Sequence, residues 1–245
     1  MCNVYQESKS LQCAFLIDVN AENLLNEIKP FELSNAIRLC TLRILTYFCD
    51  KFGWGTSNLR WGYKFYNSRA ITHLYERHEF KEFKAEYFEE FELDICKRLE
   101  ESFDKESQLQ NIQHGDVRES SGQKPYPSKC LNCALTDLIH DFEWERPDIT
   151  SPFKRSGRVS QTEDAKNRNS NFVFLFTWCP CSKKLMTSFC NRSIKSCDDF
   201  QNVVLPTALF KKFRGDCNIS LLWVDTGLWW WKVGQGLLEV RVTIT

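Results

Sequence analysis

Residues Cys13–Asp18 read CAFLID, a short and uninterrupted apolar run that ends in an acidic residue. A run of this length without polar alternation is typical of a strand that is buried on both faces, as in the middle of a parallel sheet. Two later stretches have the same character, Phe172–Thr177 (FVFLFT) and Ile219–Asp225 (ISLLWVD). Residues Leu59–Tyr66 (LRWGYKFY) alternate instead, which predicts a strand with two distinct faces.

Helical periodicity fills the intervals between these strands. Apolar residues recur at helical spacing at about 32–51, 87–101 and 130–142, and less regularly at about 182–189 and 206–213. Weaker strand patterns lie at 78–84, as a short edge strand, and at 237–243. Buried strands that alternate with helices predict an α/β fold with a doubly wound, mostly parallel sheet and helices on both faces.

Two stretches lack apolar periodicity, about 101–128 and 147–170. They are rich in polar and loop-forming residues, so both are expected to be mobile loops within one domain. No internal repeat and no break in composition divides the rest of the sequence. The expected organisation is an N-terminal extension over 1–12 and a single domain over 13–230.

The charges of the chain balance, because Lys and Arg number 32 and Asp and Glu also number 32. This balance excludes a chain-wide positive field for nucleic acid or an anionic membrane, but it leaves room for a local basic patch. Several of the 12 cysteines lie inside apolar patterns and no leader pattern opens the sequence, so reduced thiols in the cytoplasm or nucleus are expected. No apolar run approaches the roughly 20 residues of a membrane span.

Patterns for catalysis are sparse, and we expect no enzymatic activity. The four histidines belong to no nucleophile–base motif, and no phosphate-binding loop or dinucleotide fingerprint follows the first strand. Two acids, Asp18 and Asp225, follow buried strands at the edge where doubly wound sheets bind ligands. Either they hold Mg2+ or handle phosphate, or Asp18 caps a helix or braces the adjacent loop. The absence of glycines after the first strand favours the structural role.

Two cysteine pairs, Cys130/Cys133 and Cys179/Cys181, have spacings from which a four-thiolate zinc site can be built. The alternative is that these thiols are ordinary small residues at the junctions of helices and strands. The absence of flanking glycines favours that alternative. A zinc-stabilised nucleic-acid-binding module therefore stays open as a second candidate function.

Ser151 begins the sequence Ser-Pro-Phe-Lys, which fits a phosphorylation site for a proline-directed kinase. A phosphate there would lie near Lys154, Arg155 and Arg158, whose positive charges would pair with it. The same residues also suit an ordinary turn. The two interpretations stay open.

Several blocks of the sequence occur in the same order in a known family. They are Trp61–Ser68 (WGYKFYNS), Phe88–Leu93 (FEEFEL), Asp141–Pro152 (DFEWERPDITSP) and Trp223–Thr226 (WVDT). Over about residues 13–230 the chain closely resembles the N-terminal region of the Treslin (TICRR) family of metazoan replication-initiation regulators. The resemblance implies a von Willebrand A-like domain, whose fold is a doubly wound α/β sheet.

The resemblance weakens after Thr226, and it implies that 231–245 is a divergent tail. The last strand of the domain is then missing or altered. The resemblance also implies a function, because members of the family act at S-phase entry and help to assemble the active helicase at licensed origins. The implied partners are MTBP and a BRCT-repeat checkpoint scaffold, the latter bound through phosphorylated regions outside this chain. The expected role is a non-catalytic scaffold for protein interaction in the nucleus, associated with chromatin indirectly.

Domains of the von Willebrand A type often carry a metal-ion-dependent adhesion site, whose first element is D-x-S-x-S after the first strand. The matching positions here are Asp18, Asn20 and Glu22, so two hydroxyls are replaced. No threonine stands shortly before Ala134-Leu135, where the second element would lie, and Thr177 is followed by Trp178 in place of an acid. A divalent cation needs several oxygen ligands. We therefore expect a degenerate site without metal or another cofactor; the alternative is a metal-dependent adhesion-type ligand-binding domain.

The block Asp141–Pro152 places Trp144, Arg146 and Pro147 directly after the third long helix. We expect Trp144 and Pro147 to anchor the exit of this helix against the edge of the sheet, and Arg146 to pair with a nearby acid. The alternative is that Trp144 belongs to a partner-binding surface, because tryptophan combines an apolar ring with a polar N–H group.

Overall fold

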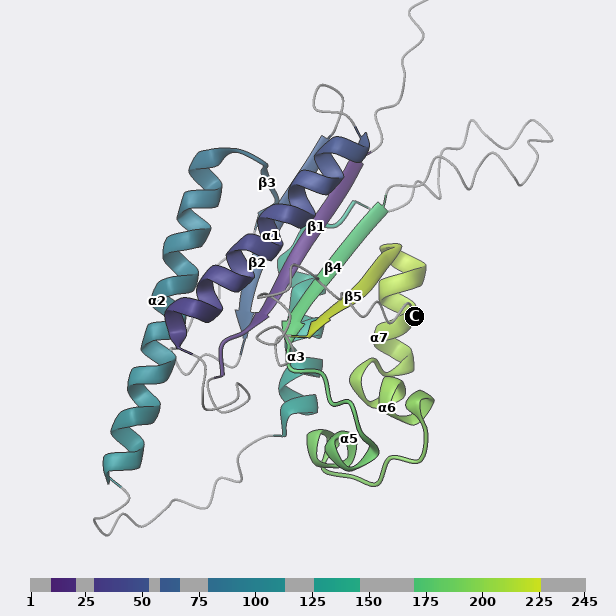
Figure 1. Cartoon of the computed structure of the whole chain (residues 1–245). Coiled ribbons are helices and arrows are strands. Elements are labelled where there is room, and N and C mark those ends of the chain that lie inside the picture. Colours follow the sequence, from purple (N-terminus) through teal and green to yellow (C-terminus); the bar gives the residue numbers. More distant parts are fainter. Residues whose placement is uncertain are drawn as a thin grey trace, which may run out of the picture.

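The computed structural model describes residues 10–20, 29–52, 58–66, 79–112, 126–145 and 170–225, and the statements below concern these residues. Their elements follow one another in the order shown in Figure 1: β1 (Ser10–Asp18), α1 (Pro30–Phe52), β2 (Asn58–Tyr66), β3 (Lys81–Glu82), α2 (Ala85–Ile112), α3 (Pro127–Asp141), β4 (Ser170–Thr177), α5 (Lys183–Cys190), α6 (Cys197–Val204), α7 (Thr207–Lys211), the π-helical turn η4 (Lys212–Asp216) and β5 (Ile219–Asp225).

The strands form one five-stranded sheet in the order β3-β2-β1-β4-β5. Strands β2, β1, β4 and β5 are parallel to their neighbours, and the two-residue edge strand β3 is antiparallel to β2. The first apolar run of the sequence is therefore the central strand, as its lack of polar alternation predicted. The prediction of a doubly wound, mostly parallel sheet is confirmed.

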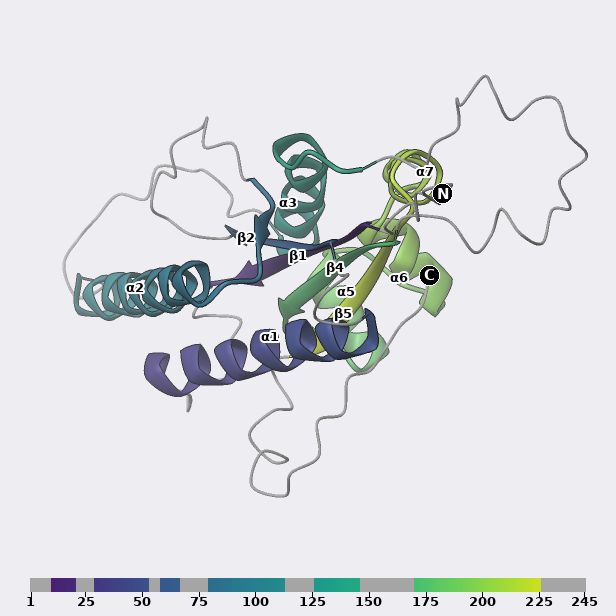
Figure 2. The same ribbon diagram turned by 90° about the horizontal axis from the view of Figure 1, so that it is seen from above.

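Helices cover both faces of the sheet, as Figures 1 and 2 show. Alternate residues of β1 point to opposite faces: Phe15 and Ile17 pack in the core under α1 and α2, whereas Ala14 and Leu16 pack in the core under α3 and α5–α7. The same alternation in β4 and β5 keeps both cores apolar, because a strand places successive side chains on opposite faces. No helix within the described ranges has the length and apolar character needed to cross a membrane.

Two boundaries and one helix differ from the sequence prediction. The strand β1 already begins at Ser10, inside the N-terminal extension expected over 1–12. The loop expected at about 101–128 is wrong at its start, because α2 continues to Ile112, whereas its expected end agrees with the start of α3 at Pro127. The second half of α2 is rich in Glu, Lys and Gln, which favour a helix by intrinsic propensity even where few apolar residues mark a buried face. The helix α6 was not predicted, although Ser196 and Asp199 form a capping box at its start.

Gly62 in β2 lies against the ring of Phe142, and this contact predicts the effect of a substitution. A Cβ at Gly62 would lie 3.1 Å from Cζ of Phe142 and closer still to Cε1, and the ring is only 3% exposed. Gly62→Ala is therefore expected to lower the free energy of unfolding by about 1–3 kcal/mol through overpacking, measured by urea denaturation. Gly215→Ala is the control, because no atom outside the neighbouring backbone lies within 4 Å of its Cβ position. Equal effects of the two substitutions would contradict the overpacking argument.

Two buried thiols in the core predict a loss of stability at alkaline pH. Burial raises the pKa of Cys13 well above its usual value, with the neighbouring Cys49 adding to the rise, and burial raises the pKa of Cys40 to about 12, against an opposing effect of Arg43. The unfolded chain ionises these thiols near their ordinary pKa of about 8.5 to 9 while the folded chain does not, so stability is complete below that pH and falls above it.

We expect the free energy of unfolding to drop by about 2–3 kcal/mol between roughly pH 8 and pH 10, measured by urea denaturation under reducing conditions. A Cys40→Ala variant should start from a lower stability at neutral pH and show a flatter decline. An equally steep decline in Cys40→Ala would show that the Cys40 thiol does not contribute.

Candidate functional site

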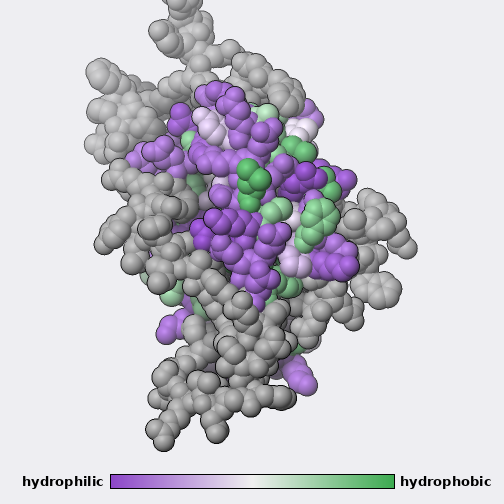
Figure 3. Space-filling view, turned by 90° about the vertical axis from the view of Figure 1, so that its left-hand side faces the viewer, coloured by the Kyte–Doolittle hydropathy of each residue, from purple (hydrophilic) through white to green (hydrophobic). Residues whose placement is uncertain are grey.

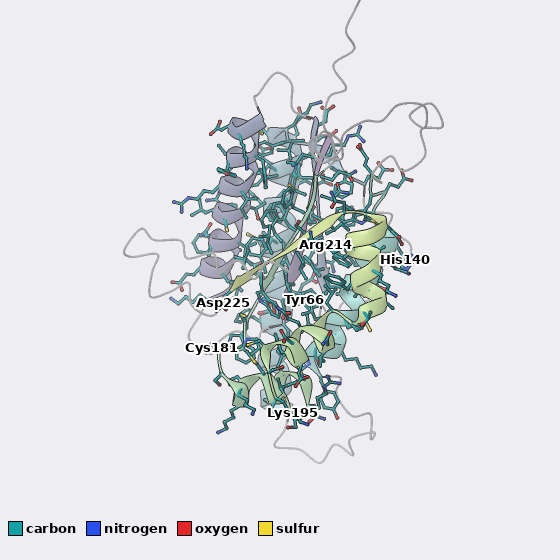
Figure 4. The ribbon with its side chains drawn as sticks, turned by 90° about the vertical axis from the view of Figure 1, so that its right-hand side faces the viewer. Tyr66, His140, Cys181, Lys195, Arg214 and Asp225 are labelled. Carbon is teal, nitrogen blue, oxygen red and sulfur yellow. The ribbon has the colours of Figure 1, made fainter. Side chains whose placement is uncertain are left out.

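The candidate site lies at the carboxyl ends of the parallel strands, where doubly wound sheets bind their ligands. Asp18, the last residue of β1, is register partner to Tyr66 at the end of β2. Thr177, the last residue of β4, is register partner to Asp225 at the end of β5. Figure 4 labels Tyr66 and Asp225 at this end of the sheet. Parallel pairing therefore brings four polar side chains to one edge from positions far apart in the sequence.

The carboxylate of Asp18 is turned toward donors of the protein. Its side chain is only 4% exposed. The hydroxyl of Thr177 donates to Oδ2 of Asp18 at 2.8 Å, and the backbone N–H of Asn20 donates to Oδ1 at 3.0 Å. Both oxygens are thus engaged inside the fold, and the Asn20 contact braces the segment that leaves β1.

The phenol of Tyr66 completes this buried network. Burial raises the pKa of Tyr66 well above its usual value, and the charge of Asp18 beside it raises that pKa further. Side-chain hydrogen bonds join the phenol to both Asp18 and Thr177. The phenol therefore stays protonated next to the carboxylate, where it acts as one more donor group for the buried charge.

Asp225 and Trp223 hold the segment that follows β4. Oδ1 of Asp225 accepts a hydrogen bond from the backbone N–H of Cys179 at 3.1 Å, and the indole N–H of Trp223 donates to the carbonyl of Thr177 at 3.1 Å. Asp225 is 8% exposed, so its carboxylate braces a loop from a nearly buried position.

The cysteine pairs do not assemble into a metal centre. All four thiols lie within the described ranges, yet no group of three or more His, Cys, Asp or Glu side chains there is placed to hold a metal ion. Burial raises the pKa of Cys130, and the charges of Asp18 and Cys133 raise it further. A thiol that is harder to ionise is a poorer metal ligand and a poorer nucleophile. The zinc site considered from the sequence has no support in this geometry.

Trp144 is the member of the predicted anchor that falls inside the described residues. Its side chain is 8% exposed, and its indole N–H donates to the carbonyl of Leu138 at 3.2 Å. Its ring lies 4.9 Å from Phe80 and 6.1 Å from Phe142, measured between centroids. The tryptophan thus folds back onto the last turns of α3. Glu22, Arg146, Pro147 and Ser151 lie outside the described residues.

The backbone around Trp144 is held by two amide side chains that the sequence did not single out. Gln12 of β1 donates from Nε2 to the carbonyl of Glu143 at 3.1 Å and accepts at Oε1 from the N–H of Glu145 at 2.7 Å. Asn171 of β4 donates from Nδ2 to the carbonyl of Glu145 at 2.9 Å. Both amides lie in otherwise apolar strands, and a polar residue in such a strand is the sequence signal that points to them.

The Thr177 hydroxyl predicts a further stability effect. Thr177→Val keeps the shape of the side chain but removes a donor from the buried Asp18 carboxylate, so the free energy of unfolding should fall by about 1–3 kcal/mol. Urea denaturation followed by circular dichroism measures it. Thr207→Val is the control, because Thr207 is exposed at the start of α7. A neutral Thr177→Val would show that the carboxylate does not depend on this donor.

Comparisons with known proteins agree on one family. The family described as "Treslin, N-terminal domain" matches residues 19–213 of the chain. The Treslin of Danio rerio is 28% identical over 238 residues, which covers 90% of this chain and 12% of that protein. The Treslins of Mus musculus and Xenopus laevis are each 28% identical over 211 residues, covering 77% and 79% of this chain and 10% of each relative.

The chain thus spans about a tenth of the length of these relatives. The matched range begins directly after β1 and ends within η4, so it includes α1 to α7 and the strands β2, β3 and β4 with the site residues Tyr66 and Thr177. Strands β1 and β5, with Asp18 and Asp225, lie outside it. Since the family match covers well over half of the sequence, the chain belongs to the family of Treslin N-terminal domains.

Proposed function

We propose that this domain is a non-catalytic scaffold for protein interaction in a regulator of DNA replication initiation. The observation that carries the proposal is the state of Asp18, whose two carboxylate oxygens already accept hydrogen bonds from Thr177 and Asn20. A cation at this edge would have to displace those donors and find several further oxygen ligands. The geometry therefore favours a structural use of the acid over metal binding or chemistry.

The topology supports the von Willebrand A-like assignment as part of the same proposal. The sheet order β3-β2-β1-β4-β5, with an antiparallel edge strand and helices on both faces, suits a doubly wound domain of that type. In such a domain Asp18 would stand at the start of the metal-ion-dependent adhesion site. Here Tyr66 and Thr177 surround it with protein donors, which is consistent with a degenerate site.

Exposed apolar side chains supply the chemistry for docking a protein. On α1 these are Phe31 (70% exposed), Leu39 (43%) and Tyr47 (58%), and on α2 Leu93 is 73% exposed. Figure 3 shows green apolar residues standing among purple polar ones on the side of the molecule that carries α2. Apolar residues at the surface are the usual anchors of protein interfaces.

The proposed partners follow from family membership. We place MTBP as the partner for this domain, and the BRCT-repeat checkpoint scaffold as a partner of regions outside this chain. The setting is the nucleus, at origins of replication during S-phase entry. The domain would then be one docking element of a much longer regulator.

Calorimetry with Mg2+, Mn2+ and Ca2+ tests the non-metal part of the proposal. The expected result is no specific heat of binding for any of the three cations. Micromolar binding that disappears in Asp18→Ala would overturn the proposal in favour of a metal-dependent ligand-binding domain.

Capture of MTBP by residues 1–245 tests the scaffold part. We expect capture to be lost in a Leu39→Lys, Leu93→Lys variant and kept in Phe210→Lys, since Phe210 is 39% exposed on α7. Failure of the unsubstituted chain to capture MTBP would contradict the assignment of this partner to this domain.

A further inference from the structure

The balanced charge of the chain conceals an uneven distribution. Helix α2 carries nine acidic and three basic residues, a net charge of −6. Residues 178–217, which include α5, α6, α7 and η4, carry seven Lys or Arg and three Asp, a net charge of +4. In Figure 1, α2 lies on the side of the β3 and β2 edge of the sheet, and the α5–η4 layer lies on the side of the β5 edge. Negative charge is therefore concentrated on α2 and positive charge on the α5–η4 layer, although the net charge of the chain is zero.

All seven cations of the α5–η4 layer are solvent-exposed. The ion pairs found among the described residues lie elsewhere: α1 with α2, β2 with α3, and within the β3–α2 region. None of the seven forms an ion pair with a carboxylate of the described ranges. Of the three aspartates, Asp199 caps the start of α6. Its Oδ2 accepts hydrogen bonds from the backbone N–H groups of Lys195 and Ser196.

The cations are spread over the layer and do not converge on one point. Lys183 and Lys184 lie in the first turn of α5, and Lys195 lies between α5 and α6. Lys211 ends α7 and Lys212 begins η4. Figure 4 labels Lys195 at the lower end of this face and Arg214 well above it. A single phosphate or carboxylate would contact only a few of these side chains, whereas an extended polyanion would contact many.

We propose that the α5–η4 layer is a binding surface for the phosphate backbone of duplex DNA. Interfaces with DNA are more positive and more polar than interfaces with proteins. The layer fits that description. Among its large apolar side chains Phe210 is exposed, and polar side chains such as Ser193 and Asn191 are exposed between the cations. Neutral donors of this kind also contact phosphate oxygens.

The same composition favours duplex over single-stranded DNA and over an acidic protein. Binding of single strands relies on several aromatic side chains that stack with bases, and an exposed Phe210 alone does not provide them. A protein interface would need apolar anchors at its centre, and these lie on α1 and α2 instead. The surface would therefore bind the phosphate backbone of the duplex without specificity for its base sequence.

This inference goes beyond the scaffold role, because it gives the domain a direct contact with chromatin in addition to any contact through partners. Contacts to phosphate alone produce weak binding, with dissociation constants of about 10⁻⁴–10⁻⁶ M at physiological salt. Such binding would hold the domain near DNA while its α1–α2 face stays available for a protein. The two faces would then be used at the same time.

Fluorescence anisotropy of the 245-residue chain with a labelled, random-sequence duplex of about 20 base pairs tests the proposal, at salt concentrations from about 50 to 200 mM. The test variant is Lys184→Glu, Lys195→Glu, Lys212→Glu. The matched control is Lys29→Glu, Arg43→Glu, Lys97→Glu, which has the same total charge but changes exposed residues of the α1–α2 side. Circular dichroism establishes that both variants are folded.

We expect the unsubstituted chain and the control to bind with similar affinity, and the test variant to bind at least about tenfold more weakly. The slope of log K against log salt should fall by about 2–3 in the test variant, since each lost phosphate contact removes about 0.9. The proposal is overturned if the unsubstituted chain fails to bind at low salt or if both variants weaken equally. It is also overturned if a labelled polyglutamate peptide binds more tightly than the duplex.

Discussion

Replacing Trp61 with alanine is expected to lower the free energy of unfolding by about 3–5 kcal/mol, the usual range for truncating a fully buried tryptophan. Trp61 is 1% exposed in the middle of β2. Its ring packs edge-on against Phe91, with centroids 5.7 Å apart, and lies 6.2 Å from Phe15 of β1. The substitution removes the side chain through which β1, β2 and α2 meet, and it leaves a cavity that these fixed elements cannot close.

The indole N–H of Trp61 adds a second contribution. It donates to the carbonyl of Glu82 at 3.3 Å, and so ties the two-residue edge strand β3 to the sheet. Trp61→Phe should cost less than Trp61→Ala, because it keeps an aromatic ring against Phe91 and loses mainly this hydrogen bond and part of the ring volume. The comparison of the two variants separates packing from the tie to β3.

Urea denaturation followed by circular dichroism measures the loss in Trp61→Ala. The matched control is Leu93→Ala, which removes a large apolar side chain that is 73% exposed and should change stability by no more than about 0.5 kcal/mol. A cost below about 1 kcal/mol for Trp61→Ala would contradict the assignment of Trp61 to the centre of the core.

The sequence was sufficient to predict the sheet, because the strands carry the strongest local pattern. The apolar run at Cys13–Asp18 contains no polar alternation, and this is typical of a strand inside a parallel sheet whose two faces are both covered by helices. The alternation of Leu59–Tyr66 likewise fits β2, whose Leu59 and Trp61 pack on one face while Tyr66 packs on the other. Where burial is decided by neighbouring strands alone, local pattern and fold agree.

The candidate site was less predictable, because it depends on register and not on local pattern. Asp18 stood out as an acid after a strand, but its donors Tyr66 and Thr177 are 48 and 159 positions away and meet it only through parallel pairing. Gln12 and Asn171 are similar: each is an amide in an apolar strand, and its backbone partner lies in the segment after α3. The polar length of α2 to Ile112 follows from helix propensity, which apolar periodicity does not detect.

Trp144→Ala is expected to have the second large effect, again a loss of about 3–5 kcal/mol in the free energy of unfolding. The ring is 8% exposed and packs against Phe80, and its N–H donates to the carbonyl of Leu138 near the end of α3. Truncation would empty this space and remove one of the two donors to the Leu138 carbonyl, which keeps the backbone N–H of Phe142. It would also loosen the turn whose backbone is held by Gln12 and Asn171.

Two further variants decide between an anchor and a partner-binding residue at this position. Trp144→Phe keeps a ring against Phe80 but has no N–H group, so its cost should be smaller, with about 0.5–1.5 kcal/mol from the lost hydrogen bond to the Leu138 carbonyl. Glu143→Ala changes an exposed neighbour whose contact with Gln12 is made by its backbone, and it should be neutral within about 0.5 kcal/mol. If Trp144→Ala instead leaves the urea midpoint unchanged and abolishes capture of a partner, the ring serves an interface and the anchoring role is wrong.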